Sequence, residues 1–341
     1  MAKSAANVRI DRPGFPFTTV LVTGGAGFIG SRVVDTLRDV PCRVVALDNL
    51  AVGLPLPAPD DLVVPIEADI RDAARMREIF SGYRPQAVMH LAAVHHIPTC
   101  EKNPRLAFDT NVMGTQTILD EATAAGIENV LLASSGAVYD WIGGALAEDT
   151  TPLRAKDVYS TTKLANEYQV ATWADRCEGR AHVARIFNTI GMNDPNAHLI
   201  PDLLRQFRGD ERECVVQLGN VAPKRDYLHV DDTAGGLVTI LGGMQDGPRA
   251  DIFNLCRGDE LSVAELVDAL ADIMGKTVII EHDAARMRRT DRLQQLGDPA
   301  KMRRRFGWSA RASVRQALAA IAEGYGLVAK DESHTGRLRR A

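Results

Sequence analysis

The segment TTVLVTGGAGFIGSRVVDTL, residues 18–37, decides the fold of this chain. Its first six residues are apolar or β-branched, which predicts a buried strand over 18–23. Glycines follow at 24, 25, 27 and 30, and residues 28–37 have the pattern of a helix. A strand, a glycine-rich turn and a helix in this order are typical of a βαβ unit that holds a dinucleotide at the helix N-terminus.

The glycines have separate predicted tasks in this unit. Gly24 allows the tight turn, Gly27 lets the backbone approach a pyrophosphate, and Gly30 lets the helix pack closely on the strand. Phe28 and Ile29 begin the helix and belong to the same predicted cofactor site. A glycine pattern by itself can be a structural turn, but here the strand, the helix and a later acid all agree.

That acid is Asp48, which ends a predicted strand over 44–48 and lies 18 residues after Gly30. Its carboxylate can accept hydrogen bonds from the adenosine ribose and would repel a 2′-phosphate. No Arg or Lys occupies the next few positions, so the sequence predicts NAD rather than NADP. Asn49 follows directly and is included in the cofactor site.

A third predicted strand, over 62–70, ends with Asp69 and Ile70, which are also assigned to the cofactor site. Asp69 can contact the adenine. The alternative for Asp69 is an N-cap of the helix that follows, because Asp is a preferred capping residue.

Strands and helices alternate through the first half of the chain. Further strands are predicted over 87–93, 129–135 and 181–188, with helices between them. This alternation predicts an α/β fold, a Rossmann-type doubly wound parallel sheet, with a smaller C-terminal α/β lobe for the substrate. The expected domains are 17–190, with later segments around 226–255 returning to it, and 191–325, with tails at 1–16 and 330–341.

Composition narrows the class of protein. The chain has 341 residues, 45% hydrophobic and 25% charged, with a net charge of −4, so a sizeable core is expected and nucleic acid is not an expected partner. No apolar run reaches membrane-spanning length, and the N-terminus lacks a signal-peptide pattern. Five scattered cysteines without a C-x-x-C pair predict reduced thiols in a cytoplasmic protein.

Tyr159 and Lys163 form a Y-x-x-x-K pattern in a predicted helix, VYSTTKLANEYQVATWA. Their spacing places both side chains on one helix face. A nearby ammonium is expected to lower the pKa of the tyrosine, which can then take a proton from a sugar hydroxyl. Such a pair is common by chance, but Ser135 closes the preceding strand and can hydrogen-bond the same oxygen.

The motifs together resemble the extended short-chain dehydrogenase/reductase family, in particular its NAD-dependent nucleotide-sugar epimerase and dehydratase branch. The resemblance covers roughly residues 18 to 325. The motifs that carry it are TGGAGFIG at 23–30, DNL at 48–50, HLAA at 90–93, NVMGT at 111–115, SSGAVY at 134–139, YSTTK at 159–163, RIFN at 185–188 and RDYLHVDD at 225–232.

The resemblance implies roles at matching positions. Ser135, Tyr159 and Lys163 would be catalytic, with Tyr159 as the base and Lys163 also touching the nicotinamide ribose. Further cofactor contacts are implied for Leu91, Ala92, Ala93 and Phe187, and contacts to a nucleotide-diphosphate sugar for Asn188, Leu199, Arg225 and Arg288. For Arg288 the alternative is a solvated basic run. The resemblance also implies a homodimer, paired through the helix after Asn111 and the helix bearing Tyr159.

The residues after Ser135 bear on the reaction. The family's 4,6-dehydratases carry an acidic pair where this chain has Gly136 and Ala137, and neither can act as an acid or base. A 4-epimerase needs no such pair, so the sequence favours a nucleotide-sugar 4-epimerase with tightly held NAD. Open alternatives are a 4,6-dehydratase using other acids, a C3 or C5 epimerase, a 4-keto reductase or dehydrogenase, and a non-catalytic NAD-sensing protein.

The chain departs from the family pattern in two places. Asp140 and Trp141 follow the SSGAVY motif, where the family usually has a glycine. A loop is predicted over 94–104, with His95 and His96 at positions where the family contacts the substrate. Either histidine can bind substrate or do acid–base work, while a metal pair is disfavoured because adjacent residues cannot easily share one ion. Cys100 can assist a C3 or C5 epimerisation or be a buried structural thiol.

Overall fold

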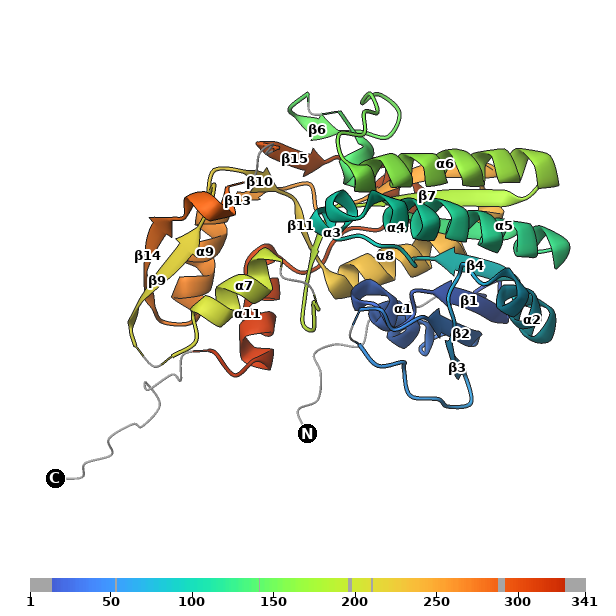
Figure 1. Cartoon of the computed structure of the whole chain (residues 1–341), viewed down its shortest axis with the longest axis horizontal. Coiled ribbons are helices and arrows are strands. Elements are labelled where there is room, and N and C mark those ends of the chain that lie inside the picture. Colours follow the sequence, from blue (N-terminus) through green and yellow to red (C-terminus); the bar gives the residue numbers. More distant parts are fainter. Residues whose placement is uncertain are drawn as a thin grey trace.

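A computed structural model describes residues 14–52, 54–140, 142–195, 198–209, 211–287 and 292–328. Figure 1 shows a large sheet flanked by helices, and beside it a smaller lobe. The ends of the predicted tails, 1–13 and 329–341, lie outside the described residues. Within the segment 1–16, Phe15 packs edge to face on the core residue Phe17, with ring centroids 5.8 Å apart.

The large sheet has seven parallel strands in the order β12-β7-β5-β4-β1-β2-β3. The direction of the strand order reverses between β1 and β4, the place where ligands bind in such sheets. This confirms the predicted α/β fold. The strands are β1 (Thr19–Thr23), β2 (Arg43–Asp48), β3 (Val63–Glu67), β4 (Ala87–His90), β5 (Asn129–Ser135), β7 (Arg180–Ile186) and β12 (Ala250–Leu255).

Helices cover both faces of the sheet (Figure 1). Successive residues of a strand point to opposite faces, so Val20 and Val22 lie in one apolar core while Leu21 lies in the other. The first core is covered by α1 (Phe28–Leu37), α8 (Val230–Gly242) and α10 (Ala300–Phe306). The second is covered by α2 (Ala73–Tyr83), α5 (Gly114–Ala124) and α6 (Val158–Cys177).

The smaller lobe has an apolar core of its own. Its elements are α7 (Leu199–Gln206), β9 (Glu213–Leu218), α9 (Val263–Ile273), β14 (Thr277–His282) and α11 (Val314–Gly324). Short strands join it to the large sheet: β13 (Leu261–Ser262), β10 (Lys224–Arg225), β15 (Gln294–Gly297) and β6 (Ala145–Leu146) form one small sheet, and β11 (Tyr227–His229) pairs with β8 (Asn188–Ile190). Single turns lie at η2 (Gly136–Val138), η3 (Met244–Asp246) and η4 (Ala284–Arg286).

The segment predicted as a loop over 94–104 is largely helical. It contains α3 (Ile97–Lys102) and the start of α4 (Pro104–Ala107), which continues into the π-helical turn η1 (Phe108–Met113) and then α5. Pro98 lies in the first turn of α3, where its missing N–H costs nothing. The Asn103 side chain accepts a hydrogen bond from the Leu106 N–H and so caps α4. The loop prediction was wrong because these local signals are short.

Two further strand predictions were too long, since β3 ends at Glu67 and β4 ends at His90. Beyond those residues the chain leaves the sheet and is available to line a site. All five cysteines are free thiols. None of the helices in the described ranges is long and apolar enough to cross a bilayer.

Candidate active site

The glycine loop after β1 has no room for side chains. Gly24 has a φ of 73°, and a Cβ atom there would lie 2.8 Å from the Ala92 nitrogen. A Cβ at Gly30 would collide with the Gly24 carbonyl oxygen. The Gly27 N–H donates to that same carbonyl at 3.0 Å. The loop therefore leaves its backbone open to a ligand at the start of α1, which fits the pyrophosphate of a dinucleotide.

Asp48 at the end of β2 ties the glycine loop to the neighbouring strand. Its Oδ2 accepts the Ala26 N–H at 3.0 Å, and its Oδ1 accepts the Leu50 N–H at 2.9 Å. A carboxylate has about four acceptor positions, so these bonds leave capacity for ribose hydroxyls. The predicted residues Leu91 and Ala92 lie against the same loop, at Gly24.

Asp69 lies beside Asn49, whose Nδ2 donates to Asp69 Oδ2 at 3.0 Å. Arg71 forms two side-chain hydrogen bonds to Asp69, at 2.9 and 2.7 Å, and these hold the pKa of that carboxyl well below its usual range. The N-cap of α2 is Asp72, whose side chain accepts the Arg75 N–H. The capping alternative for Asp69 was therefore wrong, because the capping residue is Asp72, three residues later.

The other predicted cofactor residues lie around these groups. Phe28 and Ile29 form the first turn of α1, half-buried beside the loop, and Ala93 is half-buried just past β4. Ile70 is buried, and its side chain packs where a Cβ of Gly114 would otherwise lie. Phe187 is also buried, directly after β7. All of them follow the carboxyl ends of parallel strands or begin a helix.

Tyr159 and Ser135 meet across the sheet end. Tyr159, in the first turn of α6, lies beside Ser135 at the end of β5. Burial raises the pKa of the Tyr159 phenol, and the Ser135 hydroxyl acts in the opposite direction. The structure thus brings together the two residues that the sequence paired, while their catalytic roles stay a prediction.

Lys163 donates from Nζ to the Ala133 carbonyl at 2.9 Å, one turn further along α6. Its burial lowers the pKa of the ammonium to about 8, partly offset by Glu167. That Lys163 lowers the tyrosine pKa stays a prediction: in this structure the ammonium donates to a strand carbonyl, and burial is the largest influence on the pKa of the phenol.

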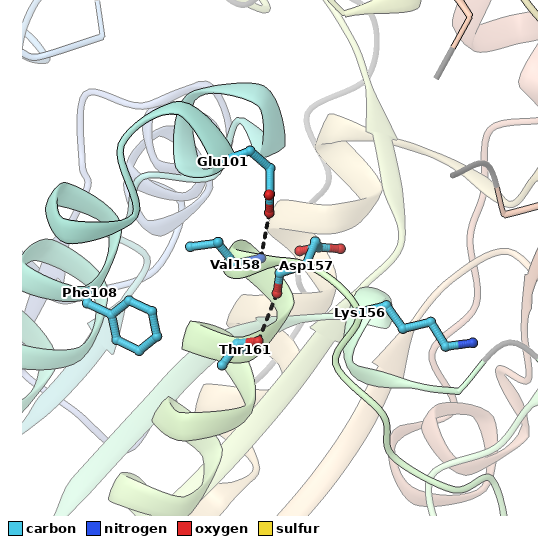
Figure 2. Close-up of a pocket in the computed structure, with 6 residues that line it drawn as sticks. All are labelled: Glu101, Phe108, Lys156, Asp157, Val158 and Thr161. Atoms are coloured by element: carbon cyan, nitrogen blue, oxygen red, sulfur yellow. Dashed lines mark hydrogen bonds between the residues drawn. The ribbon is translucent and has the colours of Figure 1, made fainter. Parts of the chain in front are cut away.

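The start of α6 is held firmly. Asp157 caps the helix and accepts the Ser160 N–H at 2.7 Å, and Glu101 from α3 accepts the Val158 N–H at 2.8 Å. Figure 2 shows Glu101, Asp157 and Val158 beside Phe108, and these residues line a pocket of about 330 Å³. Satisfied N-terminal N–H groups fix the first turn of a helix, and this turn carries Tyr159.

Buried polar bonds explain two of the motifs. His90 bonds to Thr23 at 2.7 Å through Nδ1 and to Thr115 at 2.8 Å through Nε2. Asn111 accepts the Val94 N–H at 2.7 Å and donates to Thr162 at 2.9 Å. The HLAA and NVMGT segments are thus fixed to β1 and α6, which sets the path of the chain just after β4.

A buried ion pair lies behind Ser135. Arg185 donates to both carboxylate oxygens of Glu167, at 3.0 and 2.7 Å, and Ser134 donates to Glu167 at 2.5 Å. The Arg185 guanidinium also lies 4.6 Å from the Tyr139 ring centroid. This network fixes β5, β7 and α6 relative to one another.

The first position of the family's acidic pair, Gly136, is crowded in this chain. A Cβ on Gly136 would lie 2.9 Å from the Gln295 amide nitrogen and 3.1 Å from the Phe187 ring. An acidic side chain at 136 would therefore displace two neighbours. Gln295, which the sequence analysis did not single out, fills this space from β15.

Imidazoles from both parts of the molecule converge near the site. The His198 ring centroid lies 5.9 Å from that of His95 and 5.8 Å from that of His96. His198 also bonds through Nδ1 to Asp194 at 2.7 Å, and His96 through Nδ1 to Thr99 at 2.9 Å. Burial lowers the pKa of His95 to about 4, so this imidazole is neutral near pH 7.

The predicted substrate residues occupy the border between the sheet and the lobe. Asn188 is exposed at the start of β8, Leu199 is half-buried at the start of α7, and Arg225 is half-buried in β10. Arg288 lies outside the described residues. Arg292, part of the run treated as a possible solvated segment, is instead buried and donates to three carbonyls of the turn after Ser135.

No combination of three or more His, Cys, Asp or Glu within the described ranges is arranged to hold a metal ion. Cys100 is buried, and its Sγ donates to the Val94 carbonyl at 3.3 Å. Burial raises the pKa of this thiol to about 11, which disfavours the thiolate.

Comparison with known proteins decides the family. Residues 20–256 match the NAD-dependent epimerase/dehydratase family. The chain belongs to this family. Membership confirms the resemblance seen in the motifs, the enzyme class at this level, and NAD as the family's cofactor.

Relatives in the family differ in reaction. The chain is 30% identical to UDP-glucose 4-epimerase of Lacticaseibacillus casei, over 76% of this chain and 82% of the relative. It is 28% identical to GDP-6-deoxy-D-mannose reductase of Pseudomonas aeruginosa, over 89% and 95%. The structure of Thermus thermophilus UDP-glucose 4-epimerase in complex with NAD superposes with a TM-score of 0.80 at 26% identity, over 90% of this chain and 99% of that one.

Proposed function

We propose that this enzyme is a nucleotide-sugar 4-epimerase. The observation that carries the proposal is the Tyr159–Ser135 pair at the sheet end, next to Gly136, which has no acidic side chain and is crowded by Gln295 and Phe187. Proton transfer at one hydroxyl is possible there, while loss of a C6 hydroxyl has no acid at that position.

The cofactor would be held by the glycine loop, Asp48 and residues 91–93. When bound, NAD supplies the hydride acceptor and donor for C4. Asp48 can accept hydrogen bonds from the ribose hydroxyls, and the glycine loop can contact the pyrophosphate. Tight retention is expected because an epimerase regains the hydride in the same cycle.

Tyr159 would take the proton of the C4 hydroxyl as the hydride leaves C4. Ser135 would hydrogen-bond the same oxygen and hold it in line. The 4-keto sugar would then rotate in the site and present its opposite face. As the hydride returns to C4 on that face, the Tyr159 hydroxyl would return the proton to the C4 oxygen, which gives the opposite epimer. Lys163 would contact the nicotinamide ribose and supply positive charge near the phenolate.

The substrate would lie between the sheet and the lobe. Arg225 and Arg288 are suited to a diphosphate, because guanidinium groups pair bidentately with its oxygens. Asn188, Leu199 and the two histidines His95 and His96 would contact the nucleotide-sugar. A neutral His95 suits a sugar hydroxyl better than an anion.

The second candidate is a 4-keto reductase, which the similarity to the Pseudomonas aeruginosa reductase favours. Such an enzyme must exchange its cofactor at every turnover. Purified protein that carries NAD in near-equal amount and needs none added would speak against it. A C3 or C5 epimerase is less supported, because the Cys100 thiol is buried against a carbonyl.

The experiment is a panel of UDP, GDP, CDP and dTDP sugars in D2O, read by NMR. We expect a C4 epimer without solvent deuterium. Deuterium at C5 with loss of the C6 hydroxyl would identify a dehydratase, and deuterium at C3 or C5 with all hydroxyls retained would identify epimerisation next to the ketone. Either result would refute the proposal.

We further propose a homodimer through α5 and α6. Met113, the residue just before α5, and Tyr168 in α6 expose 58% and 65% of their surface, which is high for large hydrophobic side chains. Light scattering should give a molar mass of two chains for the wild type and of one chain for Tyr168→Glu. A cytoplasmic location stays a prediction from the sequence.

A further inference from the structure

The structure assigns Arg292 as a positioning residue for Ser135 and Tyr159, an assignment that rests on the proposed function. Arg292 comes from the segment just before β15, about 150 residues away in the sequence, and is 7% exposed. Its Nη1 donates to the Gly136 carbonyl at 3.1 Å. Its Nη2 donates to the carbonyls of Ala137 and Tyr139, at 3.2 and 3.4 Å. One guanidinium thus holds the whole turn that follows Ser135.

The bonds form a continuous line to the reacting oxygen. The Gly136 carbonyl and the Ala137 N–H belong to one peptide group. Arg292 donates to the carbonyl of that peptide group, and the Ala137 N–H of the same group donates to Ser135 Oγ at 3.1 Å. Ser135 in turn lies beside the Tyr159 phenol, and its hydroxyl acts to lower the pKa of that phenol. The line therefore runs from the guanidinium through one peptide and one hydroxyl to the phenol.

A cation on the carbonyl end of a peptide strengthens the donor at its N–H end, because hydrogen bonds in series polarise one another. Because Ser135 Oγ accepts the Ala137 N–H, the serine proton is left available for donation on the side where Tyr159 lies. A donor to the charged form of an acid lowers its pKa. Arg292 therefore favours the phenolate of Tyr159 without touching it.

Other charged groups face this line. Arg292 lies near Arg225 of β10 and the carboxylates of Asp157 and Asp140, and burial with Arg225 lowers the pKa of its guanidinium to about 10. Asp140 is itself paired with Lys156 at 2.9 Å. Although burial lowers the pKa of Arg292, the guanidinium stays charged at neutral pH.

Burial is the largest influence that raises the pKa of the Tyr159 phenol; the Ser135 hydroxyl lowers this pKa, and Cys100 and Asp157 raise it. Lys163 lies on the same helix but is bonded to Ala133.

The test is the pH dependence of kcat in the holoenzyme, with the nucleotide-sugar that the wild type converts fastest. Activity that needs the Tyr159 phenolate rises with pH through an apparent pKa. We call this rising part of the pH profile the pH limb. We expect Arg292→Met to raise its apparent pKa by about half to one pH unit, with little change in KM. Arg292→Lys keeps the charge but cannot span the carbonyls, so it should move the limb less.

A double-mutant cycle separates this line from a general loosening of the site. In a Ser135→Ala background the line is cut, so Arg292→Met should cause no additional shift. An equal shift in both backgrounds would overturn the assignment, as would an unchanged limb in Arg292→Met alone. A wild type that converts none of the sugars would refute the proposed function itself, and the assignment with it.

Arg180 is the matched control for lost stability. Its Nη1 donates to the carbonyls of Met244 and Gly247, at 3.1 and 2.9 Å, in a turn at the other end of the strands. Arg180→Met should lower the melting temperature about as much as Arg292→Met and leave the pH limb unchanged. A limb that moves in both variants would contradict a specific role for Arg292.

Discussion

The cofactor side and the substrate side of the candidate site are built from different materials. The centre of the cofactor side is mostly backbone, a glycine loop closed by Asp48, and it comes from one stretch of chain, residues 24–48. The substrate side is made of side chains from distant segments, such as Arg292 against the turn after Ser135 and His198 beside His95. A backbone site tolerates no added atoms, whereas a side-chain site can be repacked.

The largest effect is expected where the backbone is closest. Gly30→Ala places a methyl group on the Gly24 carbonyl, so the loop must move. We expect the NAD content of the purified protein to fall more than about 100-fold, with a loss of about 3 kcal/mol of stability. Gly82→Ala in α2 is the control, because a Cβ there meets nothing within 4 Å. Retained NAD in Gly30→Ala would contradict a backbone-built site.

Tyr159→Phe should affect the chemistry and not the cofactor. Removing the acid–base group is expected to lower kcat by about 10² to 10⁴-fold while NAD stays bound. Tyr168→Phe, on the exposed side of the same helix, should keep full activity. Enzyme assays and NAD absorbance measure the two properties separately. A fully active Tyr159→Phe enzyme would refute the catalytic role.

Asp48→Asn tests the acid that closes the cofactor side. The amide lacks the charge that holds the Ala26 and Leu50 N–H groups, so NAD affinity should fall about tenfold, while discrimination against NADP should weaken. Asp60→Asn is the control, since Asp60 also accepts two backbone N–H bonds, from Leu62 and Val63, and none from the glycine loop. Calorimetric titration with both cofactors would measure this, and equal losses in both variants would contradict it.

The smallest effect is expected on the substrate side. Gly136→Ala presses on the flexible Gln295 amide and the Phe187 ring, so kcat/KM should fall by about threefold to tenfold, the range of mild overpacking. Adding Gln295→Ala makes room and should restore most of it. If the double variant is no better than Gly136→Ala, the space is not limited by Gln295.

The sequence predicted the cofactor side well because its signals are local. The helix 28–37 and the strand 129–135 have the predicted ends. Asp48 follows directly from strand alternation. The Tyr159–Ser135 contact was predicted because both lie at ends of regular elements.

The rest depends on contacts between distant segments. Arg292 sits in a run of basic residues whose ordinary interpretation is a solvated surface, and only its packing against residues 136–139 shows otherwise. His198 with Asp194 and the Gln295 amide gave no signal by residue type or spacing. Lys163 was expected to act on the phenol, but the geometry directs it to Ala133, which no periodicity predicts.

The most direct test of reversible oxidation at C4 is the fate of a deuterium atom placed there. The holoenzyme would be incubated with a nucleotide-sugar labelled with deuterium at C4, and the products analysed by NMR and mass spectrometry. The account predicts that the C4 epimer forms and keeps the deuterium at C4, because the hydride returns to the carbon it left. Loss of the label to solvent, or its appearance at C6 with loss of the hydroxyl there, would contradict it.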